Sequence, residues 1–267
     1  MSQARIATLN IWHDSGPWPE RLSLIRREIE LLQPDVLGLQ EVLRTLGAGP
    51  ATPETCQALA IAHGYHVAYA PAAPRDGAGP VSAGPVSAGM VWQGNAVLSR
   101  WPIREQQTFP LPGAEVAEPR SLLYALIETP HGDLPVFTTH LAWEPHHGPL
   151  RLRQVAYIAA QVDKLAPAAV LVGDFNAEPD SAEMKHLADT GFVDSWADAA
   201  PGYTFDRAND YARAADEPSC RIDYILVRGS GTAVSDARLA FTEPSHAGNT
   251  PAWPSDHYGV AAEVTLA

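Results

Sequence analysis

The sequence predicts an α/β fold built from mixed sheets with helices on the outside. Nine short runs rich in Val, Ile and Leu recur along the chain, at residues 5–11, 36–40, 66–70, 90–98, 122–128, 134–141, 168–172, 222–227 and 259–265. Many show little polar alternation, which is typical of strands covered on both faces. Helical patterns separate some of the runs, whereas runs in the middle of the chain follow one another as in hairpins. This mixture favours mixed sheets with outer helices.

Three helices are expected between these strands. Apolar residues at positions 22, 25, 29 and 32 have helical spacing, and Pro34 ends that pattern. Positions 152, 155, 159 and 162 repeat the spacing in a second helix. A third helix is expected to begin near Glu178 and to end at Gly191.

The chain of 267 residues is expected to form one domain over residues 1–267, because no break in composition marks a boundary. Its apolar content of 46% can build a sizeable core. Residues 71–89 are rich in Gly, Pro, Ser and Ala, and the five residues 79–83 are repeated at 84–88. Such a composition cannot build a core, so this segment is expected to be a flexible insertion.

Charge and composition limit the partners. The 18 Lys and Arg residues and 31 Asp and Glu residues give a net charge of −13, which disfavours broad binding to nucleic acid without excluding it. No apolar run is long enough to span a membrane, and no signal peptide is visible, so a cytoplasmic protein is expected, with a trimmed secreted form as the alternative. Two cysteines, Cys56 and Cys220, lie outside any metal-binding spacing, and both free thiols and a disulfide remain open.

Acidic and amide side chains follow two of the expected strands. Glu41 ends the run Leu39-Gln40-Glu41, where a solvated loop carboxylate is the simpler interpretation. Asp174 and Asn176 follow the apolar run at 170–172, and Gly173 before them permits a close backbone turn. Such a pair can hold a water and a phosphoryl oxygen together, although an Asx-turn is the alternative.

A second set of residues suits charge chemistry. Asp256 and His257 are adjacent, so their side chains diverge and two separate tasks are the economical interpretation. Asp223 lies in an apolar strand, where a buried carboxylate needs a partner such as His257, Arg221 or a backbone amide.

His140 and Arg120 lie at the ends of two further strands. A histidine at such a place is more often structural than catalytic. Arginine suits a bidentate grip on phosphate, but a surface salt bridge is its simpler role.

Taken together and in order, these motifs resemble those of the endonuclease/exonuclease/phosphatase superfamily. The resemblance covers nearly the whole chain and rests on Asn10, Leu39-Gln40-Glu41, Gly94-Asn95-Ala96-Val97-Leu98-Ser99-Arg100, Thr139-His140-Leu141, Gly173-Asp174-Phe175-Asn176, Arg221-Ile222-Asp223-Tyr224-Ile225 and Ser255-Asp256-His257. It implies a four-layer α/β/β/α sandwich of two mixed sheets with outer helices, and a site at one end of the sheets.

The resemblance also implies roles for these residues. Glu41 is expected to be the principal ligand of Mg²⁺ or Mn²⁺, assisted by Asn10 and Asp256. Asp174 is expected to orient or deprotonate the attacking water, and Asn176 to hold the phosphate or that water. Charge on the phosphoryl group is expected to be stabilised by three further residues: His257 paired with Asp223, and His140. Oxygen and amide ligands without cysteine favour Mg²⁺ or Mn²⁺, and one ion or two both remain open.

At two positions this sequence departs from the abasic-site endonucleases of the superfamily, and both positions bear on which substrate is expected. Arg120 occupies the place where abasic-site endonucleases have a tyrosine, and Trp12 stands where those enzymes carry an acidic residue. Both weaken a DNA-repair role. The strand end Thr139-His140-Leu141 and Arg120 are instead similar to the branch of deadenylases, sphingomyelinase-like enzymes and tyrosyl-DNA phosphodiesterases. The expected function is a divalent-metal-dependent phosphodiesterase or phosphatase. The acidic net charge and the lack of a basic stripe interleaved with aromatic residues favour small-molecule, lipid-derived or nucleotide phosphoesters as its substrates.

The alternatives are a Mg²⁺-dependent endo- or exonuclease and, more remotely, a non-catalytic binding module on the same fold. Substrate contacts are expected from five residues at or near the site: Trp12, Asn95, Trp143, His146 and Tyr203. The adjacent His146 and His147 are compatible with a surface metal site or with a solvated loop. Oligomeric state is left open.

Overall fold

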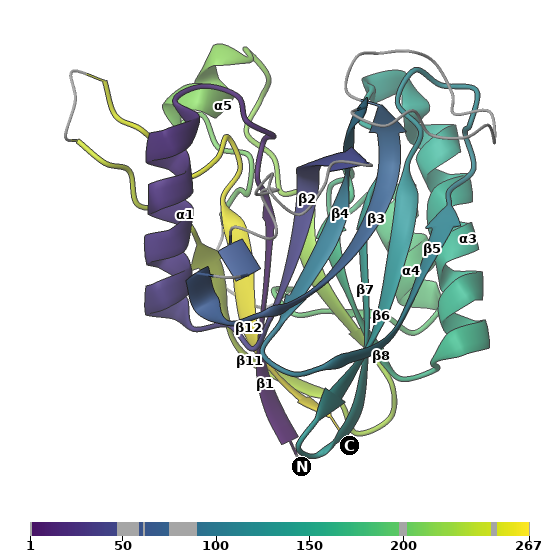
Figure 1. The fold of residues 1–267 in the computed structure, drawn as a ribbon. Helices are drawn as coiled ribbons and strands as arrows, with labels where there is room; N and C mark the ends of the chain where they lie inside the picture. The colour runs from purple at the N-terminus through teal and green to yellow at the C-terminus, as the bar shows by residue number, and fades with distance from the viewer. Residues whose placement is uncertain are drawn as a thin grey trace.

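The structure is a computed structural model that describes residues 2–46, 59–60, 62–74, 90–197, 202–246 and 250–266. Two six-stranded sheets pack face to face, and helices cover their outer faces (Figure 1). The first sheet has the order β11-β12-β1-β2-β4-β3. Its strands are β1 (Ser2–Asn10), β2 (Val36–Leu46), β3 (His66–Pro74), β4 (Met90–Ser99), β11 (Ala233–Ala240) and β12 (Gly259–Leu266).

The second sheet has the order β5-β6-β7-β8-β10-β9. Its strands are β5 (Ile103–Pro110), β6 (Ser121–Thr129), β7 (Gly132–His140), β8 (Ala169–Asp174), β9 (Val193–Asp194) and β10 (Asp223–Arg228). In each sheet one pair of strands is parallel, β1 with β2 and β7 with β8, and the other pairs are antiparallel. Both sheets are therefore mixed, as the sequence predicts.

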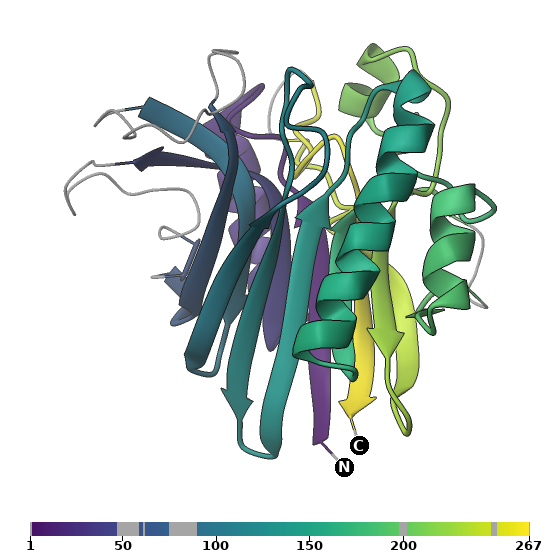
Figure 2. The same cartoon turned by 90° about the vertical axis from the view of Figure 1, so that its right-hand side faces the viewer.

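The helices complete four layers. Helix α1 (Trp18–Leu32) covers the first sheet, while α3 (Gly148–Leu165) and α4 (Ala182–Asp189) cover the second (Figures 1 and 2). A short 3-10 helix η1 (Pro145–His147) precedes α3, and α5 (Asp210–Ala214) lies in the loop before β10. This arrangement confirms the expected four-layer sandwich.

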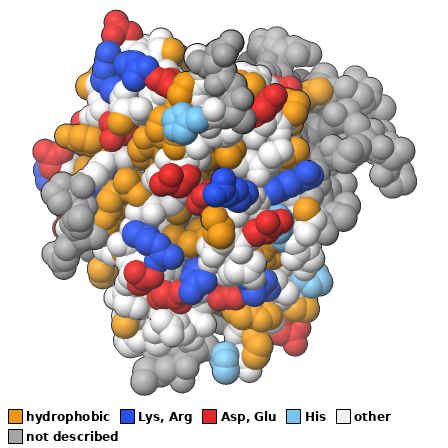
Figure 3. Space-filling model, turned by 90° about the vertical axis from the view of Figure 1, so that its left-hand side faces the viewer, with side chains coloured by type: hydrophobic (Ala, Val, Ile, Leu, Met, Phe, Trp, Pro, Cys, Tyr) orange, Lys and Arg blue, Asp and Glu red, His pale blue; other side chains and the backbone are white. Residues whose placement is uncertain are grey.

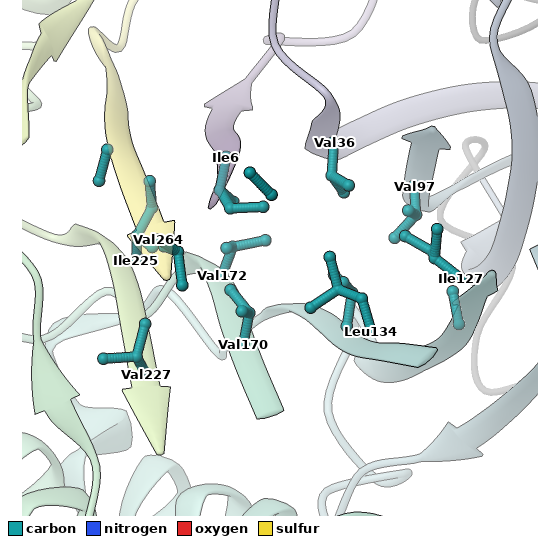
Figure 4. Close-up of a cluster of buried hydrophobic side chains, with 14 of the residues drawn as sticks. Ile6, Val36, Val97, Ile127, Leu134, Val170, Val172, Ile225, Val227 and Val264 are labelled. Carbon is teal, nitrogen blue, oxygen red and sulfur yellow. The ribbon is translucent and has the colours of Figure 1, made fainter. Parts of the chain in front are cut away.

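Each interface between layers has its own apolar core. Between the sheets, Ile6, Val36 and Val97 of the first sheet meet Val170, Val172 and Ile225 of the second (Figure 4). Successive residues of β1 point to opposite faces, so Ile6 packs between the sheets while Ala7 and Leu9 pack toward α1. On the other side Phe137 and Leu171 pack against Val155 and Ile158 of α3.

The expected helices are present, with one boundary corrected. Helix α1 ends at Leu32 because Gln33 adopts a left-handed conformation with φ 51° and Pro34 follows it. Helix α4 begins at Ala182 rather than near Glu178, because the side chain of Ser181 caps it by accepting a hydrogen bond from the Met184 amide at 3.3 Å.

Several strand predictions were incomplete. Strand β2 continues past Glu41 to Leu46, and β3 extends to Pro74, so residues 71–74 belong to a strand and not to the expected insertion. The rest of that insertion, residues 75–89, lies outside the described residues, as does Cys56. Strands β5, β9 and β11 were not expected from the sequence.

The two chain ends lie side by side at the end of the sheets where β1 begins and β12 ends (Figures 1 and 2). Ser2 is the register partner of Leu266 in the antiparallel pair of β1 and β12. Within the described part of the chain, no helix is both long and apolar enough to cross a lipid bilayer.

Candidate active site

A cavity of about 280 Å³ opens at the opposite end of the sheets. There β1, β7 and β8 end at Asn10, His140 and Asp174. Antiparallel β10 begins at the same place, where Asp223 is the register partner of Asp174. The register of β7 and β8 also pairs His140 with Asp174. The strand pairing therefore brings polar residues that are far apart in sequence to one place.

Glu41 enters the cavity from a bulge in β2. The pairing of β2 with β4 shifts between Leu39 and Val42, and Glu41 has φ 58°. The expected picture of a carboxylate just beyond a strand end is corrected here, since the strand continues and the bulge turns Glu41 out of the regular alternation. Asn10 Nδ2 lies 3.3 Å from Glu41 Oε1 and 3.0 Å from Asp174 Oδ2, so this amide bridges two carboxylates.

Asp174 is almost fully buried at the base of the cavity. Its Oδ1 accepts a hydrogen bond of 2.9 Å from the Asn176 amide, and the Asn176 side chain donates to the Leu141 carbonyl at 3.2 Å. Gly173 has φ 148°, and a Cβ there would lie 2.0 Å from the Thr139 carbonyl oxygen. The sequence predicts a close backbone turn here; the structure shows that this glycine lets β7 approach closely.

His257 and Asp223 form a buried pair. His257 Nδ1 lies 2.9 Å from Asp223 Oδ2, and His257 Nε2 faces Asp174 Oδ2 at 3.9 Å. Arg221, the alternative partner for Asp223, pairs instead with Asp194 at 2.7 Å. Asp223 Oδ1 has no hydrogen-bond partner among the described residues.

His140 and Arg120 close the other side of the cavity. Arg120 Nη1 lies 3.3 Å from His140 Nδ1, and Arg120 Nη2 pairs with Glu118 at 3.0 Å. Because a guanidinium can only donate, His140 Nδ1 must accept, and its proton therefore sits on Nε2. That nitrogen lies 3.4 Å from Asp174 Oδ2.

Burial and neighbouring charges shift the pKa values of the two histidines in opposite directions. Burial and the adjacent Arg120 hold the pKa of His140 well below its usual range. Burial alone would also lower the pKa of His257, but Asp223 outweighs it and holds that pKa well above its usual value. His140 is therefore neutral and His257 is a cation near neutral pH.

Burial and neighbouring charges also give the three carboxylates of the site different pKa values. Burial, aided by Asp223, raises the pKa of Asp174 to about 7. Burial and the nearby Glu41 raise the pKa of Asp256 to about 6. Burial would also raise the pKa of Glu41, but His13, His140 and Arg120 hold it well below its usual range.

This donor set fits a divalent cation. Glu41 and Asp256 supply carboxylate oxygens, which are the ligands that Mg²⁺ and Mn²⁺ prefer. Asn10 lies beside them, with its Nδ2 toward Glu41 and its Oδ1 accepting a hydrogen bond from the Trp12 amide at 3.0 Å. Asp256 feels the charge of Glu41 across the cavity, a repulsion that a bound cation would relieve. Asp174, Asp223 and His257 also place one ligand atom each within 4.8 Å of one another.

The five residues expected to contact substrate are not all at the cavity. Trp12 and Trp143 line it, and Trp143 is 49% exposed. Asn95 is buried beside it and donates to the Ser121 carbonyl at 2.8 Å. His146 and Tyr203 do not line the cavity.

Sequence reasoning missed one residue that lines the cavity, His13, and one that supports the loop beside it, Arg21. His13 Nδ1 lies 2.9 Å from Glu41 Oε2, and its Nε2 contacts Gln93 Oε1. Arg21 is fully buried under the loop after β1, where it donates to the carbonyls of Ile11 and Ser15. The available signal for His13 was its place three residues after Asn10, in the loop that leaves the first strand.

Known structures share this fold. A protein described as endonuclease/exonuclease/phosphatase from Beutenbergia cavernae DSM 12333 is 24% identical with a TM-score of 0.72, covering 99% of this chain and 72% of that chain. The mannosyl-6-phosphatase of Bacteroides thetaiotaomicron VPI-5482 is 18% identical with a TM-score of 0.74, covering 98% and 100%. D. rerio TDP2, complexed with a single-strand DNA product, is 21% identical with a TM-score of 0.73, covering 100% of both chains.

A comparison with curated protein sequences returned no significant match. The sequence model of the Endonuclease/Exonuclease/phosphatase family, in contrast, matches residues 7–257. That span runs from β1 to His257 and so contains every residue of the cavity described above. The chain therefore belongs to the endonuclease/exonuclease/phosphatase family.

Proposed function

We propose that this protein hydrolyses phosphate esters by attack of a water molecule, with the help of bound Mg²⁺ or Mn²⁺. The observation that carries the proposal is the convergence of three chemically distinct groups on one cavity. These are the oxygen donors around Glu41, the carboxylate Asp174 with its raised pKa, and the ion pair of His257 and Asp223. Family membership supports the same class of reaction.

Glu41, Asp256 and Asn10 would hold the cation. When bound, a divalent cation supplies charge that neutralises the phosphoryl oxygens of the substrate. The Asn10 amide contacts both Glu41 and Asp174, so it links the metal-binding carboxylate to the residue that we assign to the water.

Asp174 would accept the proton of the attacking water. A pKa of about 7 suits this task, because a general base works best when its pKa lies near the operating pH. The carboxylate is held in place by the Asn176 amide on Oδ1 and by Asn10 on Oδ2. Asn176 would hold the water or a phosphoryl oxygen beside it.

The two histidines would act on the phosphoryl group in different ways. His257 is held as a cation by Asp223, so its Nε2–H can stabilise the negative charge that develops on the phosphoryl oxygens. His140 is neutral and carries its proton on Nε2, so it can donate a hydrogen bond without adding charge. Arg120 fixes that tautomer and adds a positive charge at the cavity wall.

The surroundings of the cavity favour small or lipid-derived phosphoesters over nucleic acid. Glu118 and Glu217 line the cavity, where they would repel the neighbouring phosphates of a polynucleotide. The chain as a whole carries a net charge of −13. On the described part of the face that carries α1, acidic and basic side chains are interspersed rather than gathered into a basic strip (Figure 3).

A hydrolysis screen in Mg²⁺ tests the proposal. It should compare phosphomonoesters, small phosphodiesters, sphingomyelin-like lipids and single- and double-stranded nucleic acids. We expect turnover of a small or lipid-derived ester that is lost in Asp174→Asn and retained in Glu128→Gln, an exposed carboxylate near the far end of β6. Turnover restricted to nucleic acids would replace this substrate class by the nuclease alternative. Equal turnover in Asp174→Asn and the native protein would remove the assigned site.

A further inference from the structure

A second group of metal-ligand side chains lies outside the catalytic cavity. Glu144, His146 and His147 each place one ligand atom within 4.8 Å of the others. They belong to η1 and the residue before it, at the start of α3. None of the three lines the cavity. The sequence alone leaves this pair of histidines open between a metal site and a solvated loop.

Two of the three separations between donor atoms are close to those between ligands of one ion, and the third lies within 4.8 Å. His146 Nε2 lies 3.1 Å from Glu144 Oε2, and His147 Nε2 lies 3.6 Å from the same oxygen. Nitrogen and oxygen ligands about 2.0–2.2 Å from a tetrahedral Zn²⁺ stand roughly 3.3–3.5 Å apart. The two observed separations bracket this value, so an ion could enter with small side-chain movements.

Hydrogen bonds from Arg151 hold the backbone that carries the three ligands. Arg151 donates to the carbonyls of Ala142 and Glu144, each at 3.0 Å, and its Nε pairs with Glu183 at 3.1 Å. The His147 amide donates to the Glu144 carbonyl at 2.9 Å. A site held in this way loses little conformational freedom when an ion binds.

The cluster is also open to solvent. The side chain of His146 is 74% exposed, that of Glu144 is 33% exposed and that of His147 is 16% exposed. An ion can therefore reach the three donors from water, and a water molecule can complete its coordination. Two imidazoles and one carboxylate suit Zn²⁺ and related transition metals rather than Mg²⁺, which prefers oxygen ligands.

We propose that Glu144, His146 and His147 form a binding site for a Zn²⁺-class transition metal, separate from the Mg²⁺ or Mn²⁺ site of the catalytic cavity. Trp143 precedes Glu144 and lines that cavity, so the bound ion would sit directly behind its rim. The site does not depend on the proposed phosphoesterase activity.

The test is binding of Co²⁺ in the presence of saturating Mg²⁺, which occupies the oxygen-rich site. Visible absorption of Co²⁺ reports nitrogen ligation, and calorimetry with Zn²⁺ gives the stoichiometry. We expect one tightly bound ion in the native protein. The variants His146→Ala, His147→Ala and Glu144→Gln should each weaken binding by about tenfold or more, as loss of a ligand or its support typically does.

Two controls make the result specific. His131→Ala removes an exposed histidine from the turn between β6 and β7 and should bind Co²⁺ as the native protein does. Glu41→Gln should also retain the Co²⁺ signal. Unchanged binding in His147→Ala, or loss of the signal in Glu41→Gln, would overturn the assignment. Because His146 is largely exposed, its variant should fold and keep the test decisive even if His147→Ala unfolds.

Discussion

At the scale of single residues, the buried pair of His257 and Asp223 offers the sharpest test of the chemistry. Asp223→Asn keeps the shape of the side chain and removes the charge that holds His257 as a cation. We expect turnover to fall by about a hundredfold or more, which is typical when preorganised charge stabilisation is lost. Steady-state kinetics of the purified variant, with its folding checked by circular dichroism, gives the measurement.

The double variant shows whether the two residues act as one unit. His257→Ala alone should reduce turnover at least as much as Asp223→Asn. Combining them should cost far less than the product of the two single losses. Independent, multiplicative losses would mean that Asp223 does not act through His257.

Cys220 lines the cavity but is expected to be chemically inert. Burial, with the nearby charge of Asp174, raises the pKa of its thiol from an ordinary 9.0 to about 12. The reactive thiolate at pH 8 is then about a thousandfold scarcer than for an ordinary thiol, since each pH unit is a factor of ten. Mass spectrometry should find slow iodoacetamide labelling of Cys220 in the native protein and fast labelling in denaturant. Fast native labelling would contradict this.

The sequence indicated which residue types gather at the site better than it indicated their backbone. Trp12, His13, Glu41 and Asn176 all have positive φ values between 47° and 58°. Such conformations cost free energy for residues other than glycine, and tertiary contacts maintain them. A single sequence carries no local signal for them, so the bulge at Glu41 and the partnership of His13 with Glu41 could not be predicted.

At the scale of secondary-structure elements, Gly173 decides how closely β8 approaches β7. A Cβ at this position would lie 2.0 Å from the Thr139 carbonyl oxygen, which a backbone atom cannot avoid by rotating. We expect Gly173→Ala to lower the free energy of unfolding by roughly 3 kcal/mol or more, combining a steric clash with an unfavourable φ. Urea denaturation measures the change.

A matched glycine separates these two causes. Gly132 has a positive φ of 126°, and nothing lies within 4 Å of a Cβ built on it. Gly132→Ala should therefore show only the conformational cost, of roughly 1–3 kcal/mol, and a smaller loss than Gly173→Ala. Equal losses at the two positions would show that the approach of β7 is not the reason for Gly173.

The strands that the sequence missed share one property. Strands β5, β9 and β11 are three of the four edge strands, whereas the expected runs supply every central strand and the fourth edge, β3, whose residues Ala68, Tyr69 and Ala70 are buried. Much of β5 and β11 is exposed, so polar residues interrupt their apolar pattern. Buried central strands leave a continuous apolar run that can be recognised, but an edge strand is defined by the neighbour with which it pairs.

At the scale of the whole molecule, the acidic cavity links stability to metal binding. Glu41 and Asp256 influence each other electrostatically across the cavity, so a cation should bind the folded chain in preference to the unfolded one. Mg²⁺ at a hundred times its Kd would add about 2.7 kcal/mol to stability. For a chain of this size that corresponds to a rise in Tm of roughly 5–10 °C. Differential scanning calorimetry with and without Mg²⁺ measures it.

Removing the metal with EDTA and removing its main ligand by substitution should have consistent effects. EDTA is expected to abolish turnover, and Glu41→Gln is expected to remove most of the Mg²⁺-dependent rise in Tm. Glu128→Gln should keep the full rise, because it lies near the far end of β6. Full activity in EDTA, or a Tm that Mg²⁺ does not change, would argue against a metal site in this cavity.

The global architecture followed from the sequence because its signals are redundant. Apolar runs and helical periodicity indicate mixed sheets with outer helices, and the ordered polar motifs resemble a family with a four-layer sandwich, whose sequence model matches residues 7–257. The side-chain contacts around the site could not be predicted from the sequence, because contacts such as that of Arg120 with His140 depend on how two strands are paired. Such contacts arise only after the sheets have formed.

The pairing of β1 with β12 has a practical consequence. Both strands run the full depth of the first sheet, and the adjoining chain ends lie about 25 Å from the catalytic residues, given the length of a nine-residue strand. A fluorescent protein or affinity tag on either end would therefore leave the mouth of the cavity clear. A short linker could also join the two ends, and new ends could then be opened at the turn around His131, which gives a circularly permuted protein with its catalytic residues unchanged.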